Sequence, residues 1–329
     1  MSWEIFARTN TQDPDDRLKL RNLPPPPRWR AFSATGQPTD PDEFALKVSP
    51  QELARGANYV CSPELAEAVN AALYLRRPLL LTGNPGTGKS TLIEAVAREL
   101  RLGPVQRWAI TSRSTLRDGL YSYDALGRLN ERKPDVEAAD EDVGRFVELG
   151  PLGTALYPTS WPRALLIDEI DKSDLDLPND LLNVFEEGEV NIPELTRHPR
   201  PRVEVRLWRS QRTVAIEKGK FVCRQFPFVV LTSNGERTFP GPFLRRCIQF
   251  TIPDPRIDQL KEIVTNRLGS VSPAADALIG EFDKMRAKGD LATDQLLNAI
   301  FLTLDEKRPL SEETRRRLQE TLLKELAQK

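Results

Sequence analysis

Short apolar runs of strand length recur along this chain, each separated from the next by a helical pattern or a polar stretch. The strongest, at residues 78–82, is followed by a glycine-rich turn and then by a helical pattern over 91–100. Continuous apolar runs that alternate with helices are typical of strands buried on both faces of a parallel sheet. The pattern therefore predicts an α/β fold, with a parallel sheet in an αβα sandwich. Its further strands are expected at residues 105–111, 163–169, 228–234 and 247–253.

Two helices inside this region have clear sequence signals. Residues 63–75 form a helical pattern in which Ser62 is placed as the N-cap and Pro63 as the first helical residue. A second helix is expected over 177–187. Residues 202–224 alternate between apolar and polar positions like the strands of a hairpin. The stretch between residues 112 and 159 is mixed and predicts no defined element.

The strand-like runs stop after residue 255. Four helical patterns follow, which predicts a small all-helical domain at the C-terminal end. The first 48 residues differ again, because they are rich in proline and weakly periodic. We therefore expect a proline-rich extension at residues 1–48, an α/β domain at 49–255 and a helical lid domain at 256–329.

The extension contains the run "LPPPPRWR" at residues 23–30. Four consecutive prolines favour polyproline II, which serves as a stiff spacer or as a docking motif for a partner. Trp3, Phe6, Trp29 and Phe32 are apolar anchors in this segment. They indicate that the extension packs on the α/β domain or on a neighbouring subunit.

The glycine-rich turn after the first strand is the P-loop signature Gly-x-x-x-x-Gly-Lys-Ser. Glycines allow backbone N–H groups to turn inward around phosphate oxygens, and the following helix directs its positive end at them. Lys89 is expected to reach the β- and γ-phosphates of a nucleotide, and Ser90 to ligate Mg²⁺. The predicted phosphate-binding residues are Gly83, Asn84, Pro85, Gly86, Thr87, Gly88, Lys89, Ser90 and Thr91.

An acidic pair, Asp168 and Glu169, ends the apolar strand at residues 163–169. Hydrolysis of a phosphoanhydride needs one carboxylate near Mg²⁺ and one that polarises the attacking water. We expect Asp168 to take the metal and Glu169 the water. The acids that follow, Asp171, Asp174 and Asp176, are predicted to be solvated or capping residues.

Two further features match the same chemistry. Asn234 ends the strand at 228–234, where its amide could orient the water and sense the γ-phosphate. Arg245 and Arg246 precede the last strand, and we expect one of them, Arg246 ahead of Arg245, to reach a neighbouring subunit's γ-phosphate as an arginine finger.

Length, charge and composition exclude several classes of protein. The chain has 329 residues, enough for about two domains, and a net charge of -1, so no global field draws it to nucleic acid or to an acidic membrane. Three widely spaced cysteines and the single His198 indicate neither a disulfide framework nor a zinc site. No apolar run approaches the roughly 18 residues of a transmembrane helix, and the first residues lack a signal peptide's apolar region. We therefore expect a cytoplasmic protein.

Two surfaces leave alternatives open. The basic stretch at residues 198–212 could touch nucleic acid or a substrate chain, although a solvated hairpin face is favoured because Glu204 interrupts it. Tyr121 and Tyr123 could face a pore or a partner, or could belong to the core.

In this order the motifs resemble those of AAA+ ATPases, and within that group of the MoxR type. The resemblance covers about residues 55–255 and is carried by "ITSRSTLRDGLYSYDALGRL", "LGPLGTAL", "LLIDEIDKSDLDLPNDLLNVFEEGEVNIPEL" and "VVLTSNGERTFPGPFLRRC". It implies ATP and Mg²⁺ bound between the subunits of a homo-oligomeric ring, most often a hexamer. It also implies a mechanical or switching role beside a partner with a von Willebrand factor A domain, as in bacterial conflict systems. The resemblance also implies a basic residue in the helical lid that senses ATP. Only Arg286 or Lys288 could take this role here, and neither lies in a clear motif.

Three functions follow from these residues. The first is an ATPase that remodels or activates a protein partner, which the complete set of hydrolysis residues favours. The second is a slow nucleotide-dependent assembly switch, which needs the same pocket. The third is a nucleic-acid motor, against which the near-zero net charge counts.

Overall fold

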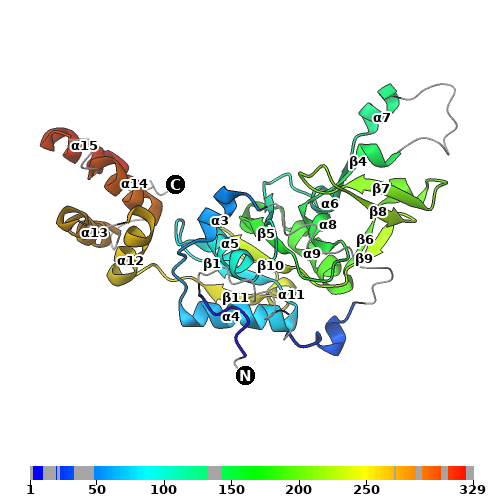
Figure 1. The fold of residues 1–329 in the computed structure, drawn as a ribbon, viewed down its shortest axis with the longest axis horizontal. Helices are drawn as coiled ribbons and strands as arrows, with labels where there is room; N and C mark the ends of the chain where they lie inside the picture. Colours follow the sequence, from blue (N-terminus) through cyan, green and yellow to red (C-terminus); the bar gives the residue numbers. More distant parts are fainter. Residues whose placement is uncertain are drawn as a thin grey trace.

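A five-stranded parallel sheet lies at the centre of the molecule (Figure 1). The computed structural model describes residues 3–9, 20, 23–32, 48–131, 143–269, 272–286, 291–304 and 310–323. The strand order is β11-β1-β10-β5-β2, so the chain crosses over between neighbouring strands rather than running in sequence. The strands are β1 (Leu79–Thr82), β2 (Gln106–Ala109), β5 (Ala164–Asp168), β10 (Phe228–Ser233) and β11 (Ile248–Thr251).

Both faces of this sheet are covered over its inner strands β1, β5 and β10, which explains why these strands read as apolar runs. Leu79 and Leu81 of β1 pack with α4 and α5, whereas Leu80 between them packs in the core cluster on the opposite face. Successive side chains of a strand alternate between faces, so a strand buried on both sides needs an apolar residue at every position. The helices of the α/β part are α3 (Pro50–Gly56), α4 (Pro63–Leu75), α5 (Lys89–Glu99), α6 (Leu116–Leu120), α7 (Ala125–Glu131), α8 (Pro151–Leu156), α9 (Asp176–Glu187), α10 (Pro193–Thr196) and α11 (Gly241–Leu244).

A second, six-stranded sheet lies to one side of the first, at the right of Figure 1. Its order is β3-β4-β7-β8-β9-β6, and most of its pairs are antiparallel. The predicted hairpin at 202–224 is part of it, but with three strands instead of two. The stretch at 112–159, for which the sequence predicts no element, contributes two more. The strands are β3 (Tyr121–Tyr123), β4 (Val147–Leu149), β6 (Glu189–Asn191), β7 (Arg202–Arg206), β8 (Thr213–Glu217) and β9 (Lys220–Val222).

Four helices form a separate small core at the opposite end of the molecule, at the left of Figure 1. The core is built by Leu260, Ile279, Phe282 and Leu296 together with their neighbours, all from the segment after residue 255. Together with the central sheet, this confirms the predicted α/β fold followed by a helical C-terminal part. The helices are α12 (Ile257–Leu268), α13 (Pro273–Arg286), α14 (Thr293–Thr303) and α15 (Glu312–Leu322). No helix in the described ranges is long and apolar enough to cross a membrane.

The first residues of the chain are fixed to the α/β domain by buried polar side chains. Asn70 of α4 accepts hydrogen bonds from the backbone N–H groups of Ile5 (2.8 Å) and Phe6 (2.9 Å), and donates to the carbonyl of Phe6 (2.9 Å). The carboxylate of Glu99 accepts from the N–H groups of Ala7 (2.7 Å) and Thr9 (2.9 Å). The segment therefore lies against α4 and α5, and its backbone hydrogen-bonding groups are paired with the side chains of these helices.

The aromatic anchors of this extension differ in their environments. Phe6 is buried, and Phe32 stacks on Phe226 with ring centroids 5.9 Å apart. Trp29 stands out, since 76% of it is exposed next to the proline run. The prediction that the extension packs on the domain is thus correct for Phe6 and Phe32, whereas Trp29 has little of its surface covered.

Replacing Asn70 by Ala should destabilise the fold because it leaves the buried backbone groups of Ile5 and Phe6 without partners. We expect a loss of about 2–4 kcal/mol in the free energy of unfolding, since each unsatisfied buried group costs about 1–3 kcal/mol. Urea denaturation measures it. The control is Glu67→Ala on the exposed face of the same helix, and equal stability of the two variants would contradict the role of Asn70.

Candidate functional site

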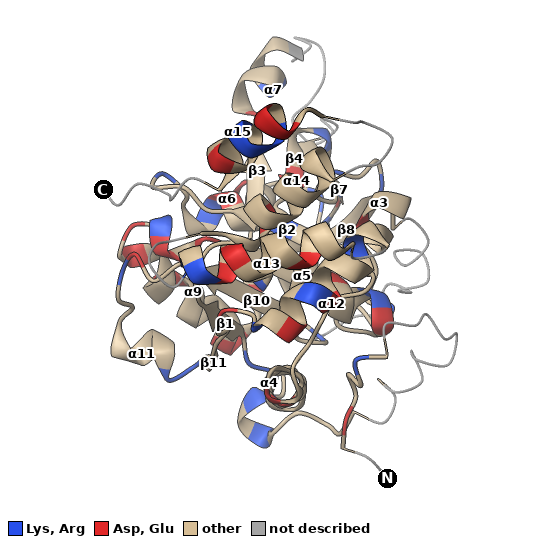
Figure 2. Cartoon of the chain, turned by 90° about the vertical axis from the view of Figure 1, so that its left-hand side faces the viewer, with Lys and Arg blue, Asp and Glu red and all other residues tan. Residues whose placement is uncertain are grey.

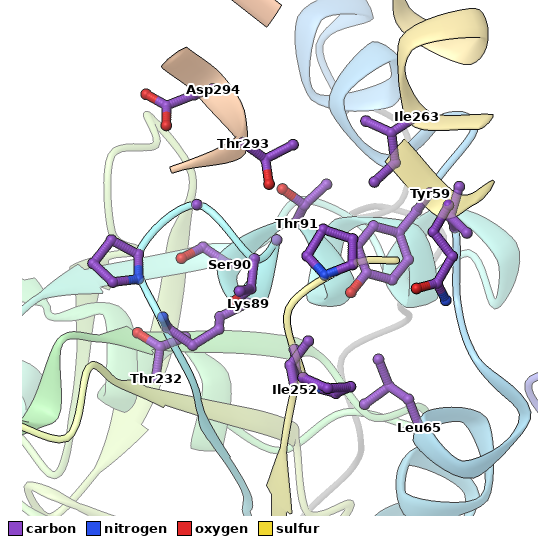
Figure 3. A pocket seen from close by; sticks show the side chains of 18 of the residues that line it. Tyr59, Leu65, Lys89, Ser90, Thr91, Thr232, Ile252, Ile263, Thr293 and Asp294 are labelled. Atoms are coloured by element: carbon purple, nitrogen blue, oxygen red, sulfur yellow. The ribbon is translucent and has the colours of Figure 1, made fainter. Parts of the chain in front are cut away.

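A cavity of about 610 Å³ lies between the carboxyl ends of β1, β5 and β10 and the C-terminal helices. Its phosphate-loop side is lined by residues 85–91, and its strand side by Asp168, Glu169, Thr232 and Asn234. The helices α12 and α14 close it from above. Figure 3 shows Lys89, Ser90 and Thr232 on one side of the cavity, with Thr293 and Asp294 above them. Most of the predicted site residues, although distant in sequence, therefore meet in one place.

The glycine-rich turn has the backbone conformation that a phosphate loop needs. Gly83, Gly86 and Gly88 have φ angles of 145°, 77° and 85°, a region that other residues rarely adopt. Helix α5 begins directly after the turn, at Lys89, so its N-terminal N–H groups face the loop. The helix begins two residues earlier than the sequence pattern predicts because the lysine and serine already belong to its first turn.

Lys89 lies across the loop that it is expected to serve. Its ammonium donates hydrogen bonds to the carbonyls of Gly83 (2.7 Å) and Asn84 (2.9 Å). These two residues therefore turn their carbonyls toward the lysine and do not line the cavity. Burial lowers the pKa of Lys89, and the carboxylates of Asp171, Asp168 and Glu169 oppose that shift. The lysine is thus a partly desolvated cation, which a phosphate would stabilise.

The loop itself is braced on its outer side. Thr87 donates to the carbonyl of Asn84 (2.8 Å), and the Asn84 amide donates to Asp254 (3.0 Å). Pro85 and Thr91 line the cavity on either side of the loop. These contacts hold the turn open for an anion.

Three oxygen ligands meet below the loop. Ser90 Oγ donates to Asp168 Oδ1 at 2.7 Å, and Thr232 Oγ1 donates to the same oxygen at 2.6 Å. A hydroxyl and a carboxylate at the loop are hard oxygen donors, which fit Mg²⁺ held partly by phosphates and water. No group of three or more His, Cys, Asp or Glu side chains suited to a metal occurs in the part of the chain that the structure describes. Ser90 and Asp168 are the residues that would hold the ion.

Glu169 occupies a sharp bend at the end of β5. Its φ of 58° is left-handed, and its N–H donates to Thr232 Oγ1 at 2.9 Å. The bend separates the two carboxylates: Asp168 faces Ser90, whereas Glu169 Oε2 accepts from Lys172 at 2.7 Å. Both carboxylates line the cavity, so the expected division of tasks is geometrically possible.

Asn234 follows the strand that lies between β1 and β5 in the sheet. It lines the cavity, and its side chain has no hydrogen bond to the residues that the structure describes. The amide is therefore free to bind a water or a phosphate oxygen.

The two arginines lie away from this cavity. Arg246 precedes β11, whose Ile248 is level with Leu79 at the start of β1, whereas the phosphate loop follows the end of β1. The Arg246 guanidinium forms an ion pair with Glu186 of α9, whose pKa it lowers. Arg245 is exposed, and its carbonyl accepts from Arg77 at 2.9 Å. Neither arginine lines the cavity of its own chain.

The lid does not place Arg286 at the cavity. Its guanidinium donates to the carbonyl of Pro255 (2.8 Å) and to Asp283 (2.8 Å), and it is not a lining residue. Lys288 lies outside the described residues. The start of α14, with Thr293 and Asp294, lies over the loop instead (Figure 3). The start of α14 thus presents a hydroxyl and an acid, and the basic residue of the lid that lines the cavity is Arg267 of α12.

The remaining wall of the cavity is apolar and was not predicted from the sequence. Tyr59, Leu65, Ile252 and Ile263 surround the side away from the carboxylates (Figure 3). An apolar slot beside a phosphate site suits a planar base. These residues come from three separate segments, and each matches an ordinary core position, so the sequence held no signal for them.

Residues 78–234 match the family model described as AAA domain (dynein-related subfamily). The match begins just before β1 and ends at Asn234, so it contains the phosphate loop and both carboxylates. It identifies this part of the chain as an AAA domain, a class that binds and hydrolyses ATP and generally uses Mg²⁺. No protein among the curated ones that were compared matches the chain.

Replacing Gly86 by Ala should weaken nucleotide binding. Its φ of 77° is strained for alanine, and the added methyl group would lie 2.8 Å from Ala292 Cβ at the start of α14. We expect a dissociation constant roughly tenfold or more higher, since a left-handed conformation alone costs about 1–2 kcal/mol. Calorimetric titration with ADP measures it.

The matched control is Gly280→Ala in α13, where an added methyl group meets nothing within 4 Å. Equal affinities for the two variants would contradict the close approach of loop and lid.

Proposed function

We propose that this chain is a MoxR-like AAA+ ATPase that uses ATP turnover between the subunits of a ring to remodel or activate a protein partner. The observation that carries the proposal is the contact of Ser90 and Asp168 at 2.7 Å, with Glu169 and Asn234 lining the same cavity. An AAA domain that only bound nucleotide would need the loop, but not a second carboxylate and an unoccupied amide beside it.

Each of these residues has one task in the proposed reaction. The P-loop N–H groups and Lys89 bind the phosphates, and Ser90 and Asp168 hold Mg²⁺, which supplies positive charge to the phosphate oxygens. Glu169 polarises the attacking water, and Asn234 orients it. Lys172 donates a hydrogen bond to Glu169 Oε2 at 2.7 Å and so orients the carboxylate.

The place of the arginines supports a ring. Because they lie at the start of β11 and the cavity lies beyond the end of β1, they cannot serve their own nucleotide site without a large rearrangement. A second copy of the chain could present Arg246, or Arg245, to the γ-phosphate. We therefore propose a homo-oligomer, a hexamer by resemblance, with ATP at each interface.

The partner is proposed to be a protein, with a von Willebrand factor A domain by resemblance. Helix α7 extends from the second sheet in Figure 1, and its Leu126 and Leu129 are 74% and 65% exposed. Exposed leucines three residues apart on a protruding helix favour a protein contact.

A nucleotide-dependent assembly switch with slow hydrolysis is the alternative, because it uses the same site. A nucleic-acid motor is disfavoured by the charge pattern. Acidic and basic residues are interspersed in Figure 2, and on the second sheet Arg206 pairs with Glu148 (3.6 Å) and Lys220 with Glu189 (3.4 Å). Because the described residues show no uniform basic face in this view, little counterion release is expected from them.

Two substitutions separate nucleotide binding from hydrolysis. Lys89→Ala should weaken ATP binding by roughly 10- to 100-fold, because a charged hydrogen-bond donor to the phosphates is lost. Glu169→Gln should keep the affinity for ATP but lower kcat by roughly 10²- to 10⁴-fold, because the general base is lost. Phosphate release and nucleotide titration measure the two effects.

Matched controls are Lys284→Ala on α13 and Glu187→Gln on α9, both exposed. Wild-type turnover in Glu169→Gln would remove Glu169 from the mechanism. A wild-type rate too slow for repeated turnover, with ATP-dependent assembly, would favour the switch.

Assemblies that mix two variants test whether Arg246 acts as an arginine finger on a neighbouring subunit's nucleotide. Arg246→Ala and Lys89→Ala subunits should each be inactive alone, but their mixture should regain turnover, because the Lys89→Ala subunit supplies Arg246 to an intact nucleotide site. Arg245→Ala and the exposed control Arg224→Ala are compared in the same assay. Full activity of both Arg245→Ala and Arg246→Ala would rule out a finger at this position.

A further inference from the structure

Asp171 is a buried carboxylate directly behind the hydrolysis residues. It lies in the short 3₁₀ turn Ile170–Lys172, which follows the left-handed bend at Glu169, and only 2% of it is exposed. The sequence predicted a solvated or capping residue. The bend turns the chain so that Asp171 points to the end of β10 instead of to solvent.

One oxygen of this carboxylate accepts three hydrogen bonds from the turn that carries Asn234. Asp171 Oδ2 accepts from Ser233 Oγ (3.0 Å), from the N–H of Asn234 (2.9 Å) and from the N–H of Glu236 (3.1 Å). Arg237 adds a fourth link, to the carbonyl of Ser173 (2.9 Å). The segment after β5 and the segment after β10 are thus joined beneath the cavity.

The other oxygen, Oδ1, is buried and has no hydrogen-bond partner in the described structure. A buried carboxylate with an unpaired oxygen costs stability, but an apolar residue in its place would leave the three donors at Oδ2 without a partner.

We propose that Asp171 is a positioning residue for ATP hydrolysis: its carboxylate fixes the backbone of Asn234, so that the Asn234 amide and Glu169 act on the same water. This inference rests on the proposed ATPase function. It makes Asn234 dependent on a residue that touches neither nucleotide nor water. The negative charge of Asp171, and not only its shape, is required, because three donors share one oxygen.

Asp171→Asn tests this. It preserves the shape but removes the charge. We expect kcat to fall by roughly 10- to 100-fold, since a displacement of about 1 Å in a catalytic group can cost about 100-fold. The dissociation constant for ADP should stay within a factor of three of the wild-type value, because the phosphate loop is intact.

A second readout does not depend on activity. Hydrogen exchange at the amides of Asn234 and Glu236, followed in peptides covering residues 230–238, should be faster in Asp171→Asn, with other peptides of the central sheet unchanged. The matched control is Asp174→Asn, the same change at an exposed position of the same segment. The control should match wild type in kcat, ADP binding and exchange.

The outcomes separate the alternatives. If Asp171→Asn keeps wild-type kcat and exchange, the inference is wrong. If it loses ADP binding and protection throughout the sheet, Asp171 has a general structural role, and the inference is also wrong. If Asp171→Asn does not fold, Ser233→Ala decides: it removes one donor and should lower kcat with faster exchange at Asn234, and wild-type values would overturn the inference. Absence of turnover in the wild-type chain rejects the proposed function instead, and the exchange data still test the contact.

Discussion

The site depends on one hydrogen-bonded contact, in which Asp168 Oδ1 accepts from Ser90 and from Thr232. Ser90 belongs to the first turn of α5, Asp168 ends β5 and Thr232 lies near the end of β10, so one helix and two strands of the central sheet meet at one oxygen. The contact fixes the phosphate loop relative to the carboxylates. It is possible because β10 and β5 are parallel neighbours, which brings the carboxyl ends of both strands to the same edge.

At the same edge, a bend at Glu169 positions the rest of the site. The left-handed conformation at Glu169 separates the two carboxylates, and it also turns Asp171 under the end of β10. Thr232 is hydrogen-bonded to both residues of the acidic pair, since it donates to Asp168 and accepts from the N–H of Glu169. The proposed metal ligand Asp168 and the proposed base Glu169 are therefore both hydrogen-bonded to Thr232, and the backbone of Asn234 is held by Asp171, two residues after Glu169.

The sequence allowed the central sheet to be predicted because its inner strands β1, β5 and β10 are apolar at nearly every position. It allowed the phosphate loop to be predicted because glycines with positive φ have few substitutes. The second sheet was harder to predict from the sequence. Its strands β3, β4, β6 and β9 have three residues each, too few to show a period of two, and their partners are distant in sequence. Asp171 was missed for a related reason: in an acid-rich segment, only the bend at Glu169 distinguishes the buried aspartate from its exposed neighbours Asp174 and Asp176. The family resemblance did not predict the lid correctly. It led us to expect a basic residue above the phosphate loop, whereas Thr293 and Asp294 lie there.

The most direct test is a structure of the assembled protein with ADP, Mg²⁺ and aluminium fluoride, which imitates the transferred phosphoryl group. The account predicts ADP in the cavity between Tyr59 and Lys89, with Mg²⁺ at Ser90 and Asp168 and the fluoride near Glu169 and Asn234. It also predicts that Arg246 or Arg245 of an adjoining subunit contacts the fluoride. Nucleotide bound elsewhere, or a filled cavity in which Glu169 and Asn234 point away from the fluoride, would contradict it.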